Sequence, residues 1–357
     1  MVTFSSNQGS VEQQLDHFSV PGHEALYQKE ESLRVRCLAC AHQCRISEGR
    51  RGVCRVRYNR KGVLYVPSGY VAGLQVDPIE KKPFYHVLPG SDALSLGMLG
   101  CNFHCDFCQN WLSSQTLRDS DALSGFQPCS AAEIESLAIR SKAASLISTY
   151  NEPLITADWA IEIFERVANK DILCGFVSNG YATPTVLEVL RPFMSLFKVD
   201  LKCFTEQGYR QVGGSLKPVL ETISRLQELG FWVEIVTLVV PGFNDSAEEL
   251  KKMAAFLASL SLDMPWHVTA FYPTYKKTDV PPTSSELLDK AWKIGKDAGL
   301  HYVYAGNLGG RGGEKEHTWC PSCGTLLVER AGFRVQYNGI VDGKCPKCSA
   351  SIAGKWH

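Results

Sequence analysis

Three cysteines lie close together in the segment LGCNFHCDFCQNW, at positions 101, 105 and 108. Cysteine thiolates are soft ligands that suit zinc, copper(I) or iron–sulfur clusters. A structural zinc ion normally has four protein ligands. Three thiolates on one loop can instead bind three irons of a [4Fe–4S] cluster and leave the fourth iron without a protein ligand. A buried helix face is the alternative, but Gly100 and Asn102 are poor helix formers. The segment therefore predicts a cluster with one open iron, bound by Cys101, Cys105 and Cys108.

Two cysteine pairs, CPSC and CPKC, stand near the C-terminus with twenty-one residues between them. The intervening residues are predicted to form a hairpin with its turn at residues 338–339, where Asn precedes Gly. Pairs at this spacing are typical of a four-cysteine zinc ribbon, and a second iron–sulfur cluster is the alternative. Zinc would stabilise a small module that lacks a core of its own. The predicted ligands are Cys320, Cys323, Cys345 and Cys348.

A third group of cysteines, near the N-terminus, consists of Cys37, Cys40, Cys44 and Cys54. Its less familiar spacing suits either zinc or an auxiliary iron–sulfur cluster, and zinc is slightly favoured. His42 could replace one thiolate, although a plain surface histidine is the simpler interpretation. Residues 34–61 contain eight arginines and one lysine against the single acid Glu48. This charge indicates a solvated face beside a negative metal centre, or alternatively a docking patch for an acidic protein or a nucleic acid.

Apolar strand-like runs alternate with helical patterns between the outer cysteine groups. The expected strands are 94–99, 146–150, 175–178, 196–201, 233–240, 268–272 and 302–305, and the expected helices are 131–144, 157–169, 185–190, 218–229, 247–260 and 285–298. Ser130 and Ser246 are good N-caps because acids follow in the first turn. The alternation predicts β–α–β units in an α/β fold with a partial or complete parallel (β/α) barrel. An open doubly wound sheet is the structural rival.

Polar residues gather at the C-terminal ends of these strands, where either architecture places its site. They are Asn151, Glu152, Ser178, Asn179, Asp200 and Lys202. Such side chains offer donors and acceptors to a ligand that carries charged and hydroxyl groups. Each residue alone could be a helix cap or a loop hydrogen bond. Several of them at successive strand ends favour one shared binding site.

The CxxxCxxC spacing of the central cysteines, with Phe107 before the last, resembles the radical S-adenosylmethionine superfamily. The resemblance implies that the open iron chelates the amino and carboxylate groups of S-adenosylmethionine. It also implies that an electron from the cluster cleaves the sulfonium to give methionine and a 5′-deoxyadenosyl radical. That radical would then abstract a hydrogen atom from the substrate.

Three further segments carry the same resemblance. TYNEP (149–153) is similar to the family's segment that meets the amino group of S-adenosylmethionine, and SNG (178–180) to the segment near its ribose and carboxylate. In KVDLK (198–202), Asp200 and Lys202 look like the family's polar contacts to the co-substrate. These segments most resemble the branch that contains glycyl-radical-enzyme activating enzymes. The lead-in DPIEKKPFYHVLPG and the N-terminal cysteines look closer still to the AmmeMemoRadiSam-system radical enzymes.

Composition narrows the remaining classes of function. The 357 residues are 45% hydrophobic and 21% charged, which is ordinary for a globular protein. The formal net charge is zero, which argues against a nucleic-acid partner. Residues 1–20 show no signal-peptide pattern, and no apolar run approaches the roughly 20 residues of a membrane span. A cytoplasmic protein without a membrane partner is expected.

The predicted organisation has three parts. These are an N-terminal segment with a four-cysteine metal module (1–90), a radical SAM barrel core (91–308), and a linker with the zinc ribbon (309–357), with the glycine-rich LGGRGGEKEH as a joint. The favoured function is a radical SAM enzyme that acts on an unidentified small molecule, peptide or protein, with an electron donor such as ferredoxin or flavodoxin. The alternatives are an activating enzyme that installs a glycyl radical on a partner protein, a nucleic-acid-modifying radical enzyme, and a purely electron-carrying iron–sulfur protein.

Overall fold

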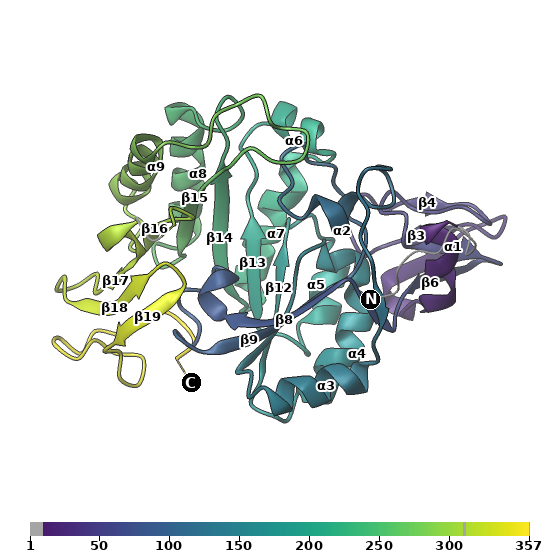
Figure 1. The fold of residues 1–357 in the computed structure, drawn as a ribbon, viewed down its shortest axis with the longest axis horizontal. Coiled ribbons are helices and arrows are strands. Elements are labelled where there is room, and N and C mark those ends of the chain that lie inside the picture. The colour runs from purple at the N-terminus through teal and green to yellow at the C-terminus, as the bar shows by residue number, and fades with distance from the viewer. Residues whose placement is uncertain (1–9, 310–311, 357) are drawn as a thin grey trace.

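The centre of the molecule is a curved eight-stranded sheet in the order β16-β15-β14-β13-β12-β11-β9-β8 (Figure 1). The structure is a computed structural model that describes residues 10–309 and 312–356. Seven strands of the sheet run parallel, and β8 pairs with β9 in the antiparallel direction. The strands are β8 (Gly73–Pro78), β9 (Asp92–Gly97), β11 (Ser145–Ser148), β12 (Leu173–Ser178), β13 (Leu196–Asp200), β14 (Trp232–Val239), β15 (Trp266–Ala270) and β16 (Val303–Gly306).

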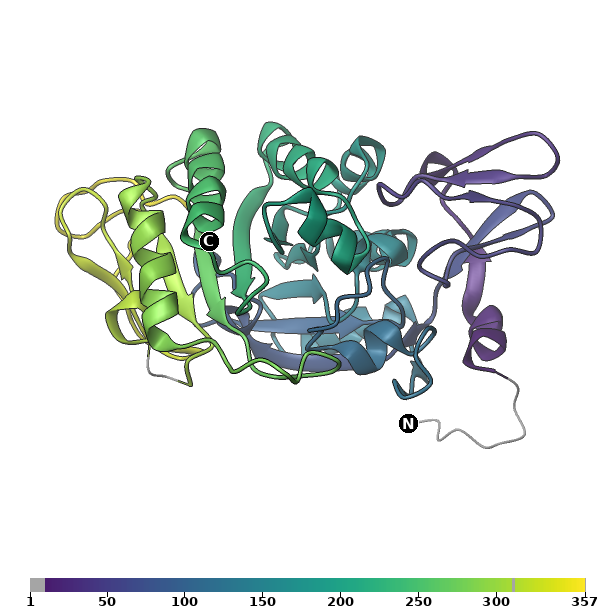
Figure 2. The same cartoon turned by 90° about the horizontal axis from the view of Figure 1, so that it is seen from above.

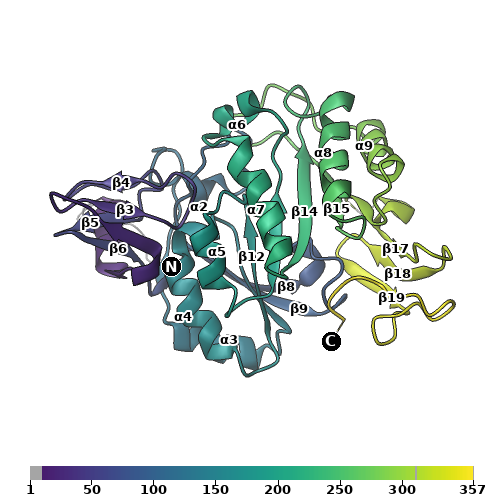
Figure 3. The same cartoon turned by 180° about the vertical axis from the view of Figure 1, so that it is seen from behind.

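Helices connect the parallel strands and cover the outer face of the sheet (Figure 3). They are α3 (Ala131–Arg140), α4 (Ala157–Val167), α5 (Pro184–Leu190), α6 (Glu206–Val212), α7 (Leu216–Glu228), α8 (Ala247–Leu260) and α9 (Ser285–Asp297), while the short α2 (Trp111–Gln115) follows the central cysteines. Ser130 and Ser246 cap α3 and α8 as predicted, because each hydroxyl accepts a hydrogen bond from a backbone N–H in the first turn.

Alternate residues of the inner strands point to opposite sides of the sheet. Val177, Lys198 and Val236 face an internal cavity, whereas their neighbours Phe176 and Phe197 are buried in the main core. The rings of Phe164 on α4 and Phe176 on β12 lie 5.9 Å apart, which joins the helical layer to the sheet. Both faces of the strands are therefore covered, as the continuous apolar runs of the sequence predict.

The predicted fold class is confirmed, and the barrel is a partial one. In the part of the chain that the structure describes, β8 and β16 are the two ends of the sheet and do not pair with each other. Each of the seven predicted strands and six predicted helices has a counterpart within a few residues. β8 and α6 were not predicted. Every residue of the edge strand β8 is at least partly exposed, so its apolar pattern in the sequence is weak. The helix α6 has only seven residues and contains Gly208, and glycine is a poor helix former.

Two smaller units flank the barrel and lie at opposite ends of the molecule (Figure 2). The N-terminal unit contains α1 (Val11–Leu15), the sheet of β1 (Ser19–Pro21), β6 (Val63–Pro67) and β5 (Tyr58–Arg60), and the sheet of β2 (Tyr27–Lys29), β3 (Val35–Cys37) and β4 (Arg45–Ile46). The C-terminal unit is the sheet of β17 (Thr318–Trp319), β18 (Leu326–Ala331) and β19 (Arg334–Asn338). A short ladder of β7 (Tyr70–Val71) and β10 (Gln127–Pro128) lies between the N-terminal unit and the barrel.

Residues 310–311 lie outside the described ranges, and with them part of the predicted glycine-rich joint. None of the helices formed by residues 10–309 and 312–356 combines the length and the apolar character that a membrane span requires.

Candidate active site

The three central cysteines lie on the loop that follows β9, at the C-terminal edge of the parallel strands. Gly100 opens this loop with φ of 90°, and a Cβ there would lie 3.0 Å from Val56 Cγ1 and 3.1 Å from the carbonyl oxygen of Cys54. Glycine is therefore needed for the loop to pack against the N-terminal unit. On the other side of the loop, Arg118 Nη1 donates to the carbonyl oxygen of Phe103 at 2.9 Å.

The three central thiols lie at the wall of a cavity and are at least half-buried. Cys105 is buried, and Cys101 and Cys108 are half-buried. Burial raises the pKa of each thiol, that of Cys105 to about 12, and the charge of Lys202 partly offsets this at Cys105 and Cys108. Within the described ranges, their three sulfurs do not all lie within 4.8 Å of one another. This spacing fits a [4Fe–4S] cluster, in which each thiolate binds a different iron and the metal favours the deprotonated sulfur.

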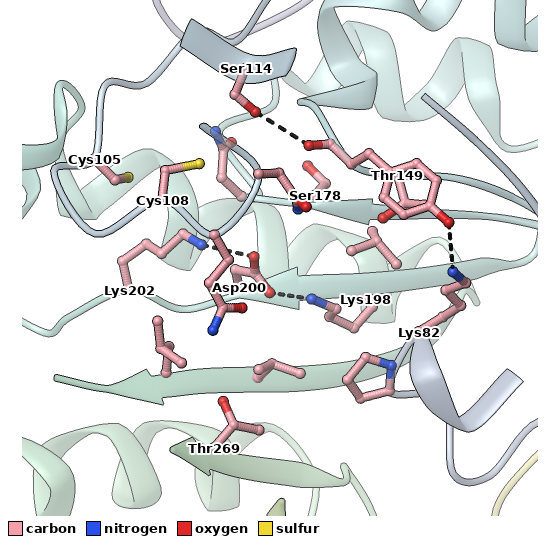
Figure 4. Close-up of a pocket in the computed structure, with 18 of the residues that line it drawn as sticks. Lys82, Cys105, Cys108, Ser114, Thr149, Ser178, Lys198, Asp200, Lys202 and Thr269 are labelled. Atoms are coloured by element: carbon pink, nitrogen blue, oxygen red, sulfur yellow. Dashed lines mark hydrogen bonds and ion pairs between the residues drawn. The ribbon is translucent and has the colours of Figure 1, made fainter. Parts of the chain in front are cut away.

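A cavity of about 410 Å³ opens beside the cysteine loop and runs along the inner face of the sheet (Figure 4). The structure brings all six strand-end residues that were predicted as binding residues to the wall of this cavity, together with the three central cysteines. They converge because the C-terminal ends of neighbouring parallel strands meet at one edge of a sheet.

Glu152 joins the ends of two neighbouring strands. One carboxylate oxygen accepts hydrogen bonds from Ser178 Oγ at 2.7 Å and from the backbone N–H of Leu154 at 3.0 Å. The other oxygen accepts from the backbone N–H of Asn179 at 2.8 Å. Burial raises the pKa of Glu152 to about 7, although these hydrogen bonds oppose the rise. Glu152 thus fixes the turns after β11 and β12 and places a titratable carboxyl group in the cavity wall.

Asn151 lines the cavity, and Asn102 lies on the cysteine loop. Asn151 Oδ1 accepts from the backbone N–H of Met98 at 3.1 Å, and Asn102 Oδ1 accepts from Asn179 Nδ2 at 2.7 Å. In the part of the chain that the structure describes, the buried Nδ2 atoms of Asn151 and Asn102 have no hydrogen-bond partner. Buried N–H groups normally have one, so the amide of Asn151 is suited to an acceptor supplied by a group bound in the cavity.

Asp200 lies between two lysine ammonium groups (Figure 4). It forms an ion pair with Lys202 Nζ at 2.8 Å and another with Lys198 Nζ. Burial raises the pKa of Asp200, but the charges of Lys198 and Lys202 outweigh it and hold the pKa at about 2. Asp200 is therefore ionised at neutral pH, and the charge of Lys202 also acts on the thiols of Cys105 and Cys108.

The inner part of the cavity contains residues that the sequence did not predict. Lys82 Nζ forms an ion pair with Asp77 at 3.0 Å and donates to Tyr150 Oη at 3.1 Å. Lys198, Tyr150 and Thr269 also line the cavity. The signal available in the sequence was the alternation along a strand, which puts Lys198 on the same face as Asp200. Lys82 had no such signal because it precedes β9 in an irregular segment.

The four C-terminal cysteines converge on one point. Their sulfurs all lie within 4.8 Å of one another, with Cys320 and Cys348 separated by 3.6 Å and Cys323 and Cys345 by 3.7 Å. A tetrahedral ion with zinc–sulfur bonds of about 2.3 Å requires sulfurs about 3.8 Å apart. The geometry thus fits one zinc-sized ion with four thiolates.

The four N-terminal cysteines are near one another but do not converge in this way. Within residues 10–309 and 312–356, no three of their sulfurs lie mutually within 4.8 Å. His42, considered as a substitute ligand, has its Nε2 atom 3.0 Å from the carbonyl oxygen of Asn102. Its ring is therefore engaged with the central cysteine loop.

Comparison with known proteins places this site in a family. Residues 96–257 match the model of the radical SAM superfamily. An uncharacterised protein of Methanocaldococcus jannaschii is 38% identical over 330 residues, which cover 91% of this chain and 97% of that protein. The pyruvate formate-lyase-activating enzyme of Clostridium pasteurianum is 22% identical over 168 residues, 45% of this chain and 67% of that enzyme. A solved radical SAM methyltransferase from Sphaerobacter thermophilus has a TM-score of 0.47 at 15% identity, covering 67% of this chain and 71% of that one.

The cysteine loop, the parallel sheet and the match of residues 96–257 to the family model together define a radical SAM enzyme. The chain belongs to the radical SAM superfamily, and within it to the branch of activating-enzyme-like proteins. The family implies a [4Fe–4S] cluster and S-adenosylmethionine as cofactors. The finer resemblance to the AmmeMemoRadiSam-system enzymes stays a prediction.

Proposed function

We propose that this enzyme cleaves S-adenosylmethionine reductively and uses the 5′-deoxyadenosyl radical to abstract a hydrogen atom from a substrate bound in the same cavity. The observation that supports this is the convergence of three cysteine thiols and six polar strand-end residues on one cavity of about 410 Å³. When bound at Cys101, Cys105 and Cys108, the cluster would supply the electron that breaks the sulfonium bond.

The residues of the chain would bind and orient S-adenosylmethionine. Three protein donors already occupy Glu152, and a carboxylate has about four acceptor positions, so one remains for the amino group. The free Nδ2 hydrogens of Asn151 and the ammonium group of Lys202 would meet the carboxylate of S-adenosylmethionine. Ser178 and Asn179 are proposed to lie near the ribose.

The apolar wall of the cavity would protect the radical. Phe103, Phe107 and Leu238 line it beside the polar residues. An apolar surface limits the access of water to a reactive intermediate. At the inner end, Asp77 is shared by Lys81 and Lys82, and Asp200 is shared by Lys198 and Lys202. Each carboxylate balances only one of its two ammonium groups, so Lys82 and Lys198 favour a substrate that carries an anionic group.

A second candidate function is the activation of a partner enzyme by installing a glycyl radical on it. The similarity to the pyruvate formate-lyase-activating enzyme of Clostridium pasteurianum favours it. In that case the substrate would be a protein, and the stable product would be a radical with an EPR doublet on the partner. Both candidates require an external electron donor, for which a ferredoxin or flavodoxin is proposed. We further propose that the C-terminal ribbon binds zinc, on the sulfur spacing described above.

The test is cleavage of S-adenosylmethionine by anaerobically reconstituted protein under dithionite. The wild type is expected to release 5′-deoxyadenosine, and the triple variant Cys101→Ala/Cys105→Ala/Cys108→Ala is expected to release none. Cys129→Ala is the matched control, because Cys129 is a buried cysteine that does not line the cavity. Release of 5′-deoxyadenosine by the triple variant would overturn the proposal.

A further inference from the structure

The N-terminal cysteines form a compact group in a small unit of their own. The backbone N–H of Cys37 donates to the carbonyl oxygen of Cys44 at 3.0 Å, which pairs the two ends of the β3–β4 hairpin. Cys37, Cys40 and Cys54 are buried, and Cys44 is half-buried.

The spacing of these sulfurs differs from that of the ribbon. The ribbon sulfurs all lie within 4.8 Å of one another, as ligands of one ion must. Among the described residues, neither the N-terminal group nor the central group contains three sulfurs that all lie within 4.8 Å of one another. Thiolates at separate corners of a [4Fe–4S] cluster are farther apart than thiolates on one ion, because each binds a different iron. The N-terminal group therefore resembles the central group, and differs from the ribbon, in that its sulfurs do not converge on one ion.

A buried arginine faces this group with unused donors. Arg57 is 1% exposed, and its Nη1 atom forms an ion pair with Asp158 at 2.6 Å. Over the described ranges, its Nε and Nη2 atoms are buried without a hydrogen-bond partner. The charges of Cys37 and Cys54 act on the same guanidinium group. A buried N–H requires an acceptor, and the sulfides and thiolates of an anionic cluster would supply it.

The group lies directly against the central cysteine loop. Besides the close approach of Gly100 to Cys54, Arg118 bridges the two sites by donating to the carbonyl oxygens of Phe103 and Val53. Asn102, which follows the first cluster cysteine, acts on the thiol of Cys40 through its side chain. The two cysteine groups are thus separated by single side chains and a few backbone atoms.

We propose that Cys37, Cys40, Cys44 and Cys54 bind a second [4Fe–4S] cluster, which passes electrons to the cluster at the central loop. This inference replaces the zinc favoured for these cysteines on sequence alone, and its relay role rests on the proposed function. A low-potential one-electron carrier reduces the outer cluster by one electron. The outer cluster is reoxidised when it reduces the inner cluster, and that electron is the one consumed in cleaving the sulfonium bond.

The surface around the outer site suits an acidic carrier. The segment that carries the four cysteines also contains exposed basic residues, namely Arg34, Arg45, Arg50, Arg55, Arg60 and Lys61. Some are engaged locally, as Arg45 is with Glu30 at 3.3 Å. An excess of exposed basic residues in the unit that holds an electron-entry site favours docking of an acidic redox protein, because complementary charge raises the association rate. The chemistry of the proposed carrier is therefore that of an acidic protein of the flavodoxin or ferredoxin class.

The first experiment counts iron without altering the N-terminal unit. Anaerobically reconstituted full-length wild type is expected to hold about eight irons, and the Cys101→Ala/Cys105→Ala/Cys108→Ala variant about four, since each cluster holds four. The remaining cluster in the variant should give an EPR signal after reduction that S-adenosylmethionine does not change, because it has no open iron. A triple variant with no iron and one additional zinc would overturn the inference while leaving the proposed function intact. If the wild type holds four irons and the triple variant keeps all four, the proposed function is overturned instead.

The second experiment tests the relay. Cys40→Ser/Cys54→Ser should retain about four irons, with an EPR signal that S-adenosylmethionine shifts. Cleavage driven by reduced flavodoxin is expected to fall well below the wild-type rate, whereas cleavage driven by dithionite, a small reductant that can enter the cavity, should stay close to it. Equal rates with flavodoxin in variant and wild type, or an equal loss with both reductants, would overturn the relay. The Cys129→Ala variant is the control in both experiments.

Discussion

Glu152 shows how one side chain can serve structure and binding together. Its two oxygens tie Ser178 and Asn179 to the turn after β11, so much of its role is to position other groups. It nevertheless lines the cavity with a pKa of about 7, raised by burial. A neutral carboxylic acid is a poor acceptor for an amino group, so the protonation state of Glu152 should control the affinity for S-adenosylmethionine.

The expected consequence is a pH dependence of cofactor binding. An acid with a raised pKa of about 7 is mostly protonated at pH 6 and mostly ionised at pH 8. The affinity for S-adenosylmethionine should therefore rise about tenfold between these values. Titration followed by EPR of the reduced cluster measures it. Glu152→Gln should remove this dependence and weaken binding at pH 8 by about ten- to a hundredfold, with normal iron content.

The control for Glu152→Gln is Glu162→Gln, at an exposed position on α4. It should reproduce the wild-type affinity and pH profile. Wild-type binding in Glu152→Gln at both pH values would show that the carboxyl group is purely structural.

Asp200 leads to a prediction about stability. Its neighbour Lys198 has a side chain only 5% exposed, so Asp200→Asn leaves a buried ammonium group without its counterion. Breaking a buried pair from one side costs about 3–5 kcal/mol, and because 27% of the Asp200 side chain is exposed we expect a loss of about 3 kcal/mol. Denaturant unfolding of the reconstituted protein measures the change. Lys198→Met/Asp200→Asn should recover part of the loss, and a double variant less stable than Asp200→Asn would contradict this account.

At the scale of elements, the parallel core was predictable because each of its strands is covered on both faces. Strands that are rich in apolar residues, such as β14, in which most residues are buried, can be recognised in the sequence. The strand β8 was not predicted, because a partly exposed antiparallel edge strand is not distinguished by its apolar residues. The six strand-end residues were predictable because a parallel sheet brings its C-terminal ends together. Lys82 was not, because its place in the cavity depends on tertiary packing.

The ribbon is the element whose stability should depend most directly on a metal. Its cluster of buried residues is small and includes Cys320 and Cys345 themselves. Metal analysis is expected to find about one zinc per chain in the ribbon, lost in Cys320→Ser/Cys345→Ser because structural zinc sites need four ligands. Limited proteolysis should then cut the chain after residue 312 while the barrel remains resistant. Cys129→Ser is the control, and iron in place of zinc at the ribbon would contradict the prediction.

At the scale of the whole molecule, the ribbon closes the open side of the barrel. Arg330 on β18 donates to the carbonyl oxygen of Tyr85 at 2.7 Å, and its guanidinium group lies 4.2 Å from the centre of the Tyr85 ring. Tyr85 lines the cavity, and so does Phe333, which lies at the tip of the β18–β19 hairpin. The two cysteine modules thus meet the barrel at different ends, one beside the cluster loop and one beside the inner cavity. No sequence pattern predicts such contacts, because they join residues about 245 positions apart.

The ion pair between Arg330 and Glu80 should hold this closure in place. The two charged atoms lie 3.6 Å apart, and both side chains are fully buried. Arg330→Met or Glu80→Gln alone leaves one buried charge unpaired, which costs about 3–5 kcal/mol. Each single variant should therefore release the ribbon to protease at lower denaturant concentration than the wild type, while the iron bound by the central cysteines stays unchanged. Because Glu80→Gln/Arg330→Met removes both charges, it should be more stable than either single variant. A double variant whose loss equals the sum of the two single losses would show that the pair does not couple the ribbon to the barrel.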